Sequence, residues 1–166
     1  MLNPSVEASQ VLRDFWSLPF PVDPVTIGRK LGVQIFDASL PNSVSGALIK
    51  APGRDPYIIL EETDSPTRKR FSCAHELGHY ISRLKSNDDS DTYEFVDFRD
   101  GRSSSGEDPE EVFANSFAAN LLMPVDEFKK ECCENNNIFH IASYFGVSPE
   151  AVKYRMKALG VYGHVR

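Results

Sequence analysis

Two histidines four positions apart, His75 and His79, place the strongest constraint on how this chain can fold. They lie in a helical pattern that starts after Ser65-Pro66 and runs to about Leu84. Because residues four apart share one face of a helix, both imidazoles can point at a single ion. Glu76 would sit beside that ion without binding it, where it can take a proton from a water that the ion activates.

A helix of this kind needs a second helix close to it. Phe71, Ala74, Gly78 and Ile81 form an apolar strip beside the histidines, which indicates that this face is buried. Gly78 in the middle of a helix costs about 1 kcal/mol relative to alanine unless it lets another backbone come close. The pattern therefore predicts a second helix packed against Gly78.

The segment that begins at Asp108 supplies that helix and, on it, an acidic residue as the third ligand. At 100° per residue, Glu111 lies in line with small residues such as Ala114, so its carboxylate can approach the histidine helix closely. Asn115, one turn further on, could hydrogen bond to a ligand from behind. Glu110 points along the bulky face and remains the alternative ligand. Alternatively, Glu111 does not bind a metal and instead forms a capping box with Asp108.

Two imidazoles, one carboxylate and an open fourth position suit Zn²⁺. We therefore expect His75, His79 and Glu111 to bind zinc, and Glu76 to act as the general base that passes a proton to the leaving amine of a cleaved peptide bond. Three residues are equal candidates for stabilising the oxyanion of that reaction: Tyr80, Tyr93 and His140.

The rest of the pattern predicts one α+β domain over residues 1–166, with a small three-stranded sheet packed against a helical bundle that carries the histidine helix. The strands are expected at 33–36, 46–49 and 57–60, and the last could be an edge strand that pairs with an extended peptide or an interior one. Residues 86–111 carry ten acidic side chains against two arginines. We expect a flexible acidic loop over 86–108, with at most a short strand at 93–96, and a helix-turn-helix-like pair over 138–160.

Composition narrows the function classes. The net charge of −6 and a pI near 5.2 disfavour direct nucleic-acid binding, and three basic side chains on the last helix (Lys153, Arg155 and Lys157) are few for phosphate contacts. No apolar run reaches the roughly 18 residues of a membrane span. Three cysteines without zinc-finger spacing, and a first segment unlike a signal peptide, predict a reduced, cytoplasmic protein.

Three motifs in order resemble one known family. Residues 68–80 (RKRFSCAHELGHY) look like the active-site helix of the ImmA/IrrE zinc metallopeptidases, 111–124 (EVFANSFAANLLMP) are similar to their second motif, and 141–160 match in character. The resemblance implies a thermolysin-like zinc site with His75, His79 and Glu111 as ligands and Glu76 as base. It also implies a bacterial, phage or mobile-element protease that cleaves a helix-turn-helix transcriptional repressor.

A second hypothesis belongs to a different class of protein. The chain could be a regulatory module that neutralises a repressor or toxin partner by binding alone, with zinc structural or absent. A structural zinc site is more often closed by four protein ligands, so the open three-ligand set favours the peptidase.

Overall fold

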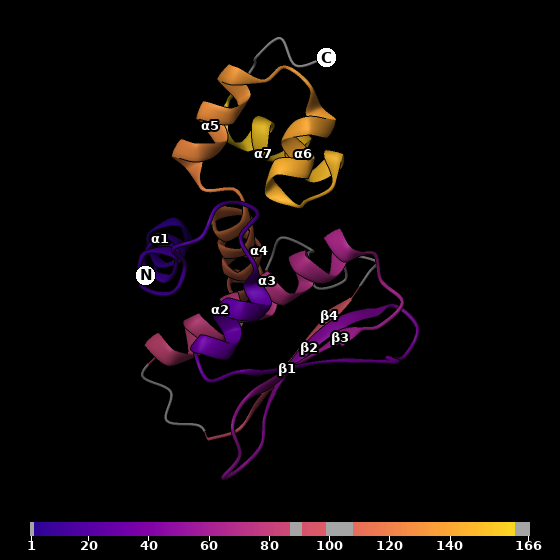
Figure 1. The fold of residues 1–166 in the computed structure, drawn as a ribbon. Coiled ribbons are helices and arrows are strands. Elements are labelled where there is room, and N and C mark those ends of the chain that lie inside the picture. Colours follow the sequence, from indigo (N-terminus) through magenta and orange to yellow (C-terminus); the bar gives the residue numbers. More distant parts are fainter. Residues whose placement is uncertain (1, 87–90, 99–107, 162–166) are drawn as a thin grey trace.

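The computed structural model describes residues 2–86, 91–98 and 108–161, and these form an α+β fold of seven helices and four strands (Figure 1). The elements in chain order are α1 (Pro4–Phe15), α2 (Pro24–Lys30), β1 (Gln34–Ala38), β2 (Val44–Lys50), β3 (Tyr57–Glu61), α3 (Pro66–Lys85), β4 (Tyr93–Phe98), α4 (Pro109–Leu122), α5 (Val125–Glu134), α6 (Ile138–Phe145) and α7 (Pro149–Leu159). The predicted α+β class is confirmed.

Five of the seven described helices start in the same way, with a polar capping side chain followed by a proline in the first turn. The cap accepts hydrogen bonds from the free backbone N–H groups, and proline loses nothing there because its missing N–H would be unpaired. Ser65 caps α3 in this way and Asp108 caps α4. The two helices that bear the candidate site therefore begin where the sequence predicts.

The sheet has four strands rather than the predicted three, in the order β1-β3-β2-β4. β1 pairs parallel to β3, and the other two pairings are antiparallel. The interior position of β3 rules out its alternative role as an edge strand, because β1 occupies its other side. β4 covers the short strand that the sequence allowed at 93–96 and extends it to residue 98. The acidic residues around it are typical of a loop, so the sequence pattern gave only a weak strand signal.

The predicted acidic loop over 86–108 falls largely outside the described residues. Residues 87–90 and 99–107 are not described, and β4 occupies most of what lies between them. The described part of this segment is thus a paired strand of the sheet, next to β2.

Helix α3 lies between the sheet and α4, contacting β2, β3 and β4 on one side and α4 on the other (Figure 1). All residues from Ser72 to Ile81 are buried. A Cβ added to Gly78 would lie 2.9 Å from the Cα of Ala114 and 3.2 Å from its carbonyl oxygen. The expected second helix is therefore α4, and it crosses α3 at the glycine.

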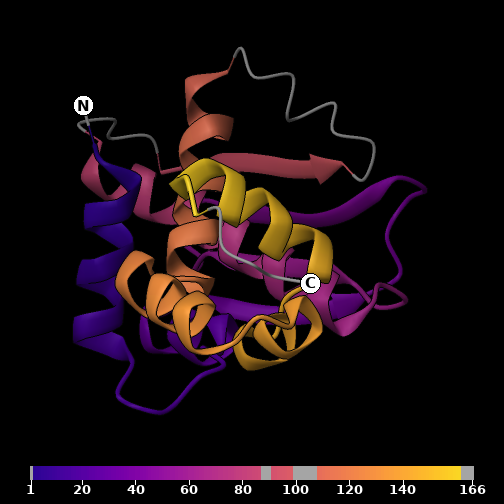
Figure 2. The same cartoon turned by 90° about the horizontal axis from the view of Figure 1, so that it is seen from above.

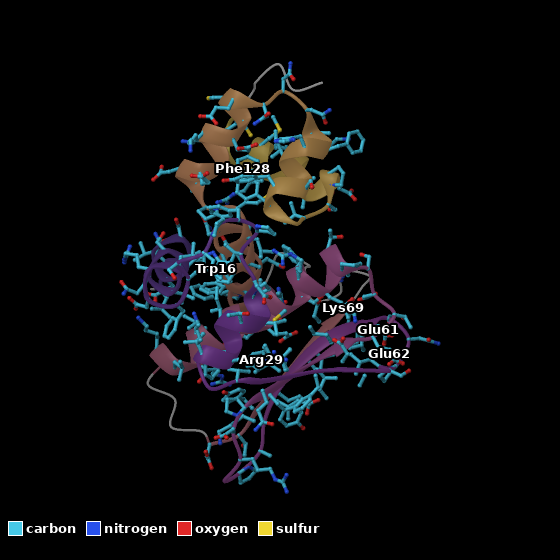
Figure 3. The ribbon with its side chains drawn as sticks, viewed as in Figure 1. Trp16, Arg29, Glu61, Glu62, Lys69 and Phe128 are labelled. Atoms are coloured by element: carbon cyan, nitrogen blue, oxygen red, sulfur yellow. The ribbon has the colours of Figure 1, made fainter. Side chains whose placement is uncertain are left out.

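Helices α5 to α7 sit together above α4, and Phe128 of α5 points into this group (Figures 1 and 3). Its ring lies 5.6 Å from that of Phe145 on α6. Two arginines join the group to the histidine helix and its neighbour. Arg70 of α3 donates to the carbonyls of Val22 and Gly146, and Arg155 of α7 donates to the Met123 carbonyl at the end of α4.

None of the helices in the described ranges is long and apolar enough to cross a membrane.

Replacing Gly78 by alanine should lower the free energy of unfolding by about 1–3 kcal/mol, because the new methyl group meets backbone atoms of α4 that cannot move without separating the helices. Gly28→Ala in α2 is the matched control, since its methyl group meets mainly the flexible end of Ile35. Urea unfolding of the metal-free proteins measures both. A Gly78→Ala protein as stable as the wild type would show that the helices do not need this contact.

Candidate metal centre

His75, His79 and Glu111 meet where α3 crosses α4. Their ligand-type atoms all lie within 4.8 Å of one another. The two Nε2 atoms are 3.1 Å apart, and Glu111 oxygens lie 3.4 Å from Nε2 of His75 and 3.1 Å from Nε2 of His79. The structure thus brings together the three residues that the sequence singled out as ligands.

The arrangement fits a small cation. Nδ1 of His75 lies 3.0 Å from the side-chain oxygen of Asn115, which can only accept, so Nδ1 carries the proton and Nε2 presents a lone pair. That lone pair faces Nε2 of His79 and the Glu111 carboxylate, and such a group of electron-rich atoms attracts a cation. Ligand atoms around a tetrahedral zinc lie about 3.3 Å apart, given bonds of about 2.0–2.1 Å. The observed separations match that spacing.

Glu111, not Glu110, is the acidic residue at this centre. The Glu111 side chain is 12% exposed and turned toward the histidines, whereas Glu110 is exposed on the outside of α4. Asp108 accepts a hydrogen bond from the Glu110 amide, so it caps the helix without the Glu111 side chain. The capping-box alternative for Glu111 is therefore not what the structure shows.

The charge state of Glu111 favours cation binding. Burial acts to raise the pKa of this carboxyl, but its contacts with the His75 and His79 imidazoles hold it at about 2. The group is therefore ionised at neutral pH, as a metal ligand must be.

Glu76 is fully buried on the same helix, one residue from His75. Among the described residues, neither of its carboxylate oxygens has a well-aligned hydrogen-bond partner. Burial and the negative charges of Asp97 and Glu111 raise its pKa well above the usual value, and the backbone of Leu48 offsets only part of this rise. A buried carboxyl without partners destabilises the fold, and such groups cluster at functional sites.

Strand β4 contributes two residues that sequence reasoning missed. The Phe95 ring stacks on His79 with centroids 4.3 Å apart and planes 13° apart, covering the imidazole. Asp97 is buried and accepts a hydrogen bond from Ser72. The alternation of Tyr93 and Phe95 is the sequence signal for this strand, and the acidic residues around them favour a loop instead.

The three oxyanion candidates do not gather at this centre. The hydroxyl of Tyr80 donates to the Leu31 carbonyl, and Tyr93 packs near Arg83 and Phe95, one ring further from His79. His140 lies on α6, 3.3 Å from Glu131. Within the described residues, none of these three side chains forms a hydrogen bond, an ion pair or a ring contact with His75, His79 or Glu111.

The basic face expected on the last helix is also smaller than predicted. Arg155 is 7% exposed, and its guanidinium donates to the Asn120 side chain and the Met123 carbonyl. It joins α7 to α4 and is not available to a phosphate. Only Lys153 and Lys157 of the three remain on the surface.

Substituting Glu111→Gln should weaken zinc binding by more than about 100-fold, since it removes the only charged ligand of the described cluster. Glu110→Gln, one position earlier and exposed, should leave zinc affinity unchanged. Competition with a chromophoric chelator measures both constants. Equal losses in the two variants, or none, would contradict the assignment.

In the metal-free protein, Glu76→Gln should raise stability more at high pH than at low pH. The folded-state pKa of Glu76 lies above its usual 4.5, so the folded chain holds a proton that the unfolded chain has lost. The free energy of unfolding of the wild type therefore falls as pH rises above about 4.5, and the variant lacks this contribution. Urea unfolding from about pH 5 to about pH 8 tests this, and a constant difference between the proteins would contradict it.

The chain is similar to one known protein family and to a phage protein. The family model for peptidase M78, described as the IrrE N-terminal-like domain, matches residues 29–157. Uncharacterized immunity region protein 2 of Bacillus phage phi105 is 26% identical over 102 residues, which cover 61% of this chain and 59% of the phage protein.

Among solved structures, a Mycobacterium tuberculosis transcriptional regulator is similar with a TM-score of 0.64 and 20% identity. The match covers 93% of this chain and 46% of the regulator, and at this identity it shows a shared fold. The chain spans less than two thirds of the length of either relative. The resemblance to the ImmA/IrrE proteins is confirmed: the chain belongs to the peptidase M78 family, a family of metallopeptidases.

Proposed function

We propose that this protein is a zinc-dependent endopeptidase that cleaves a partner protein, a helix-turn-helix transcriptional repressor. One observation carries the proposal. Three ligand-type atoms from His75, His79 and Glu111 converge with the spacing of a tetrahedral site. The buried carboxylate of Glu76, which follows His75 on the same helix, lacks a well-aligned hydrogen-bond partner among the described residues. A fourth position left open for substrate is typical of catalytic rather than structural zinc sites.

Each residue has a defined part in the proposed reaction. His75, His79 and Glu111 would hold the cation, and Asn115 keeps the His75 ring in the tautomer that leaves Nε2 free to bind. A bound zinc supplies Lewis acidity to a water and to the peptide carbonyl. Glu76 accepts the proton from the attacking water on a carboxylate oxygen and delivers it to the nitrogen of the leaving amine.

A raised pKa suits Glu76 for both halves of this transfer. The base must accept a proton in one step and release it in the next, which works best when its pKa lies near the working pH. Burial and the neighbouring charge of Asp97 shift the pKa in that direction.

The names of two relatives support a repressor as the substrate. One is named as a phage immunity region protein and another as a transcriptional regulator, which fits a role in gene control. We also propose that residues 1–166 act as one domain, since Arg70 and Arg155 tie the C-terminal helices to α3 and α4. Free Cys73, Cys132 and Cys133 support a reducing, cytoplasmic setting.

The decisive variant is Glu76→Gln, which keeps the shape of the side chain but cannot accept the proton. Co-expressed with the repressor encoded nearest to it, the variant should bind zinc like the wild type and cleave at least about 100-fold more slowly. Mass spectrometry of the repressor fragments measures cleavage. Glu110→Gln is the matched control and should cleave at the wild-type rate.

The same experiment separates the peptidase from a protein that acts by binding. If Glu76→Gln still relieves repression while the repressor stays intact, the protein works by contact and the proposed reaction is wrong. Cleavage by Glu76→Gln at the wild-type rate would likewise exclude Glu76 as the base.

A further inference from the structure

The two imidazoles of the metal centre are held in different ways. His75 keeps its orientation through the hydrogen bond between its Nδ1 and Asn115. Nδ1 of His79 is buried and has no hydrogen-bond partner among the described residues. A metal-binding histidine normally donates its other ring N–H to an acceptor, which fixes the orientation of the ring. Within the described structure, the plane of the His79 ring is therefore set by a contact of another kind.

An aromatic ring supplies that contact. Phe95 of β4 lies nearly parallel to the His79 imidazole, with centroids 4.3 Å and planes 13° apart. The torsion that turns an imidazole has a broad energy minimum, so the ring turns easily unless its neighbours prevent it. Turning His79 would drive its edge into Phe95, because stacked rings at this separation are already in van der Waals contact. The stack therefore keeps Nε2 of His79 directed at the Glu111 carboxylate, 3.1 Å away.

The Phe95 ring is itself held by its neighbours on β2 and α3. Leu48, which is fully buried, is the residue opposite Phe95 on β2. The guanidinium carbon of Arg83 lies 5.5 Å from the centre of the ring, within the range of a cation–π contact. Arg83 and His79 are four residues apart on one face of α3. Phe95 is therefore packed against two consecutive turns of the histidine helix.

Strand β4 is fixed to the same helix at a second point. Asp97 is two residues from Phe95 on the strand and so faces the same side. Its carboxylate accepts a hydrogen bond of 3.1 Å from the Ser72 hydroxyl and lies 3.7 Å from Nη2 of Arg68. These contacts matter because β4 lies at one edge of the described sheet, with β2 as its neighbour (Figure 2). Asp97 and Phe95 together hold this edge strand against α3.

We propose that Phe95 is a positioning residue of the metal centre: it holds the His79 ring in the plane that directs Nε2 toward the cation, and Asp97 anchors the strand that carries it. The inference rests on the proposed zinc centre and extends it to a strand that supplies none of the three ligands. Zinc affinity then depends on the flat face of residue 95. A space-filling role would require only its apolar volume.

Two substitutions of Phe95 separate the flat face from the volume. Phe95→Leu keeps an apolar side chain but removes the face that stacks on His79, and it should weaken zinc binding by about tenfold, as expected when a group that orients a metal ligand is lost. Phe95→Tyr keeps the ring and should bind zinc within about twofold of the wild type. Competition with a chromophoric chelator measures the affinity of the full-length proteins.

The visible absorption of the Co²⁺-loaded proteins reports the geometry of the site without relying on activity. Phe95→Leu should shift or weaken the Co²⁺ bands, whereas Phe95→Tyr should keep the wild-type spectrum. With the repressor as substrate, Phe95→Leu should lower kcat by about tenfold and leave KM nearly unchanged, because a turned ligand affects the reacting atoms more than the binding of the substrate.

A matched control and a remote variant complete the test. Phe98→Leu is the same substitution on the same strand, but its side chain lies on the opposite face of the sheet, so it should change neither zinc affinity nor the Co²⁺ spectrum. Ser72→Ala removes the hydrogen bond to Asp97 without changing residue 95, and it should weaken zinc binding by about threefold. This second variant keeps the test decisive if Phe95→Leu does not fold.

The outcomes distinguish this inference from the proposed function. Unchanged zinc affinity and Co²⁺ spectrum in Phe95→Leu, or a loss of affinity in Phe95→Tyr as large as in Phe95→Leu, would overturn the role of Phe95. Equal losses in Phe95→Leu and Phe98→Leu would also overturn it, because they would follow from a less stable sheet. A wild type that binds zinc but cleaves no repressor would contradict the proposed function, while a ring-dependent zinc affinity would still support the positioning role.

Discussion

The close approach of α3 and α4 at Gly78 and Ala114 is the contact on which the rest of the site depends. A side chain at position 78 would meet the α4 backbone, so only glycine lets the helices cross at this distance. At that distance the Glu111 carboxylate of α4 reaches both imidazoles on α3. Had the helices been held apart by an ordinary side chain, Glu111 would face water and the two histidines would be buried without a partner.

Around this crossing the fold holds polar groups where an apolar core would be more stable. The middle of α3 is buried on all sides, yet it carries two histidines and a carboxylate. Asn115 satisfies one imidazole and Phe95 covers the other. Both oxygens of Glu76 lack well-aligned partners in the described residues, as does Nδ1 of His79. A fold selected for stability alone would not keep the Glu76 carboxyl, which is why its position points to chemistry.

The C-terminal helices have a structural role, in which an arginine that looks suited to nucleic-acid binding holds another helix. Arg155 uses its donors to hold the end of α4, and Arg70 reaches the turn after α6 from the opposite side. These bonds place α7 over the α3–α4 seam, where it lines one side of an apolar groove.

The sequence by itself determined whatever depends on neighbours along the chain. Capping residues and prolines set the helix starts, the four-residue spacing put His75 and His79 on one face, and the small face of α4 singled out Glu111 over Glu110. Only the tertiary structure decided which strands pair and what covers the site. It placed β3 inside the sheet, made the acidic segment around Phe95 a strand, and buried Arg155. Burial and pairing depend on residues far away in the chain, so local charge and periodicity do not determine them.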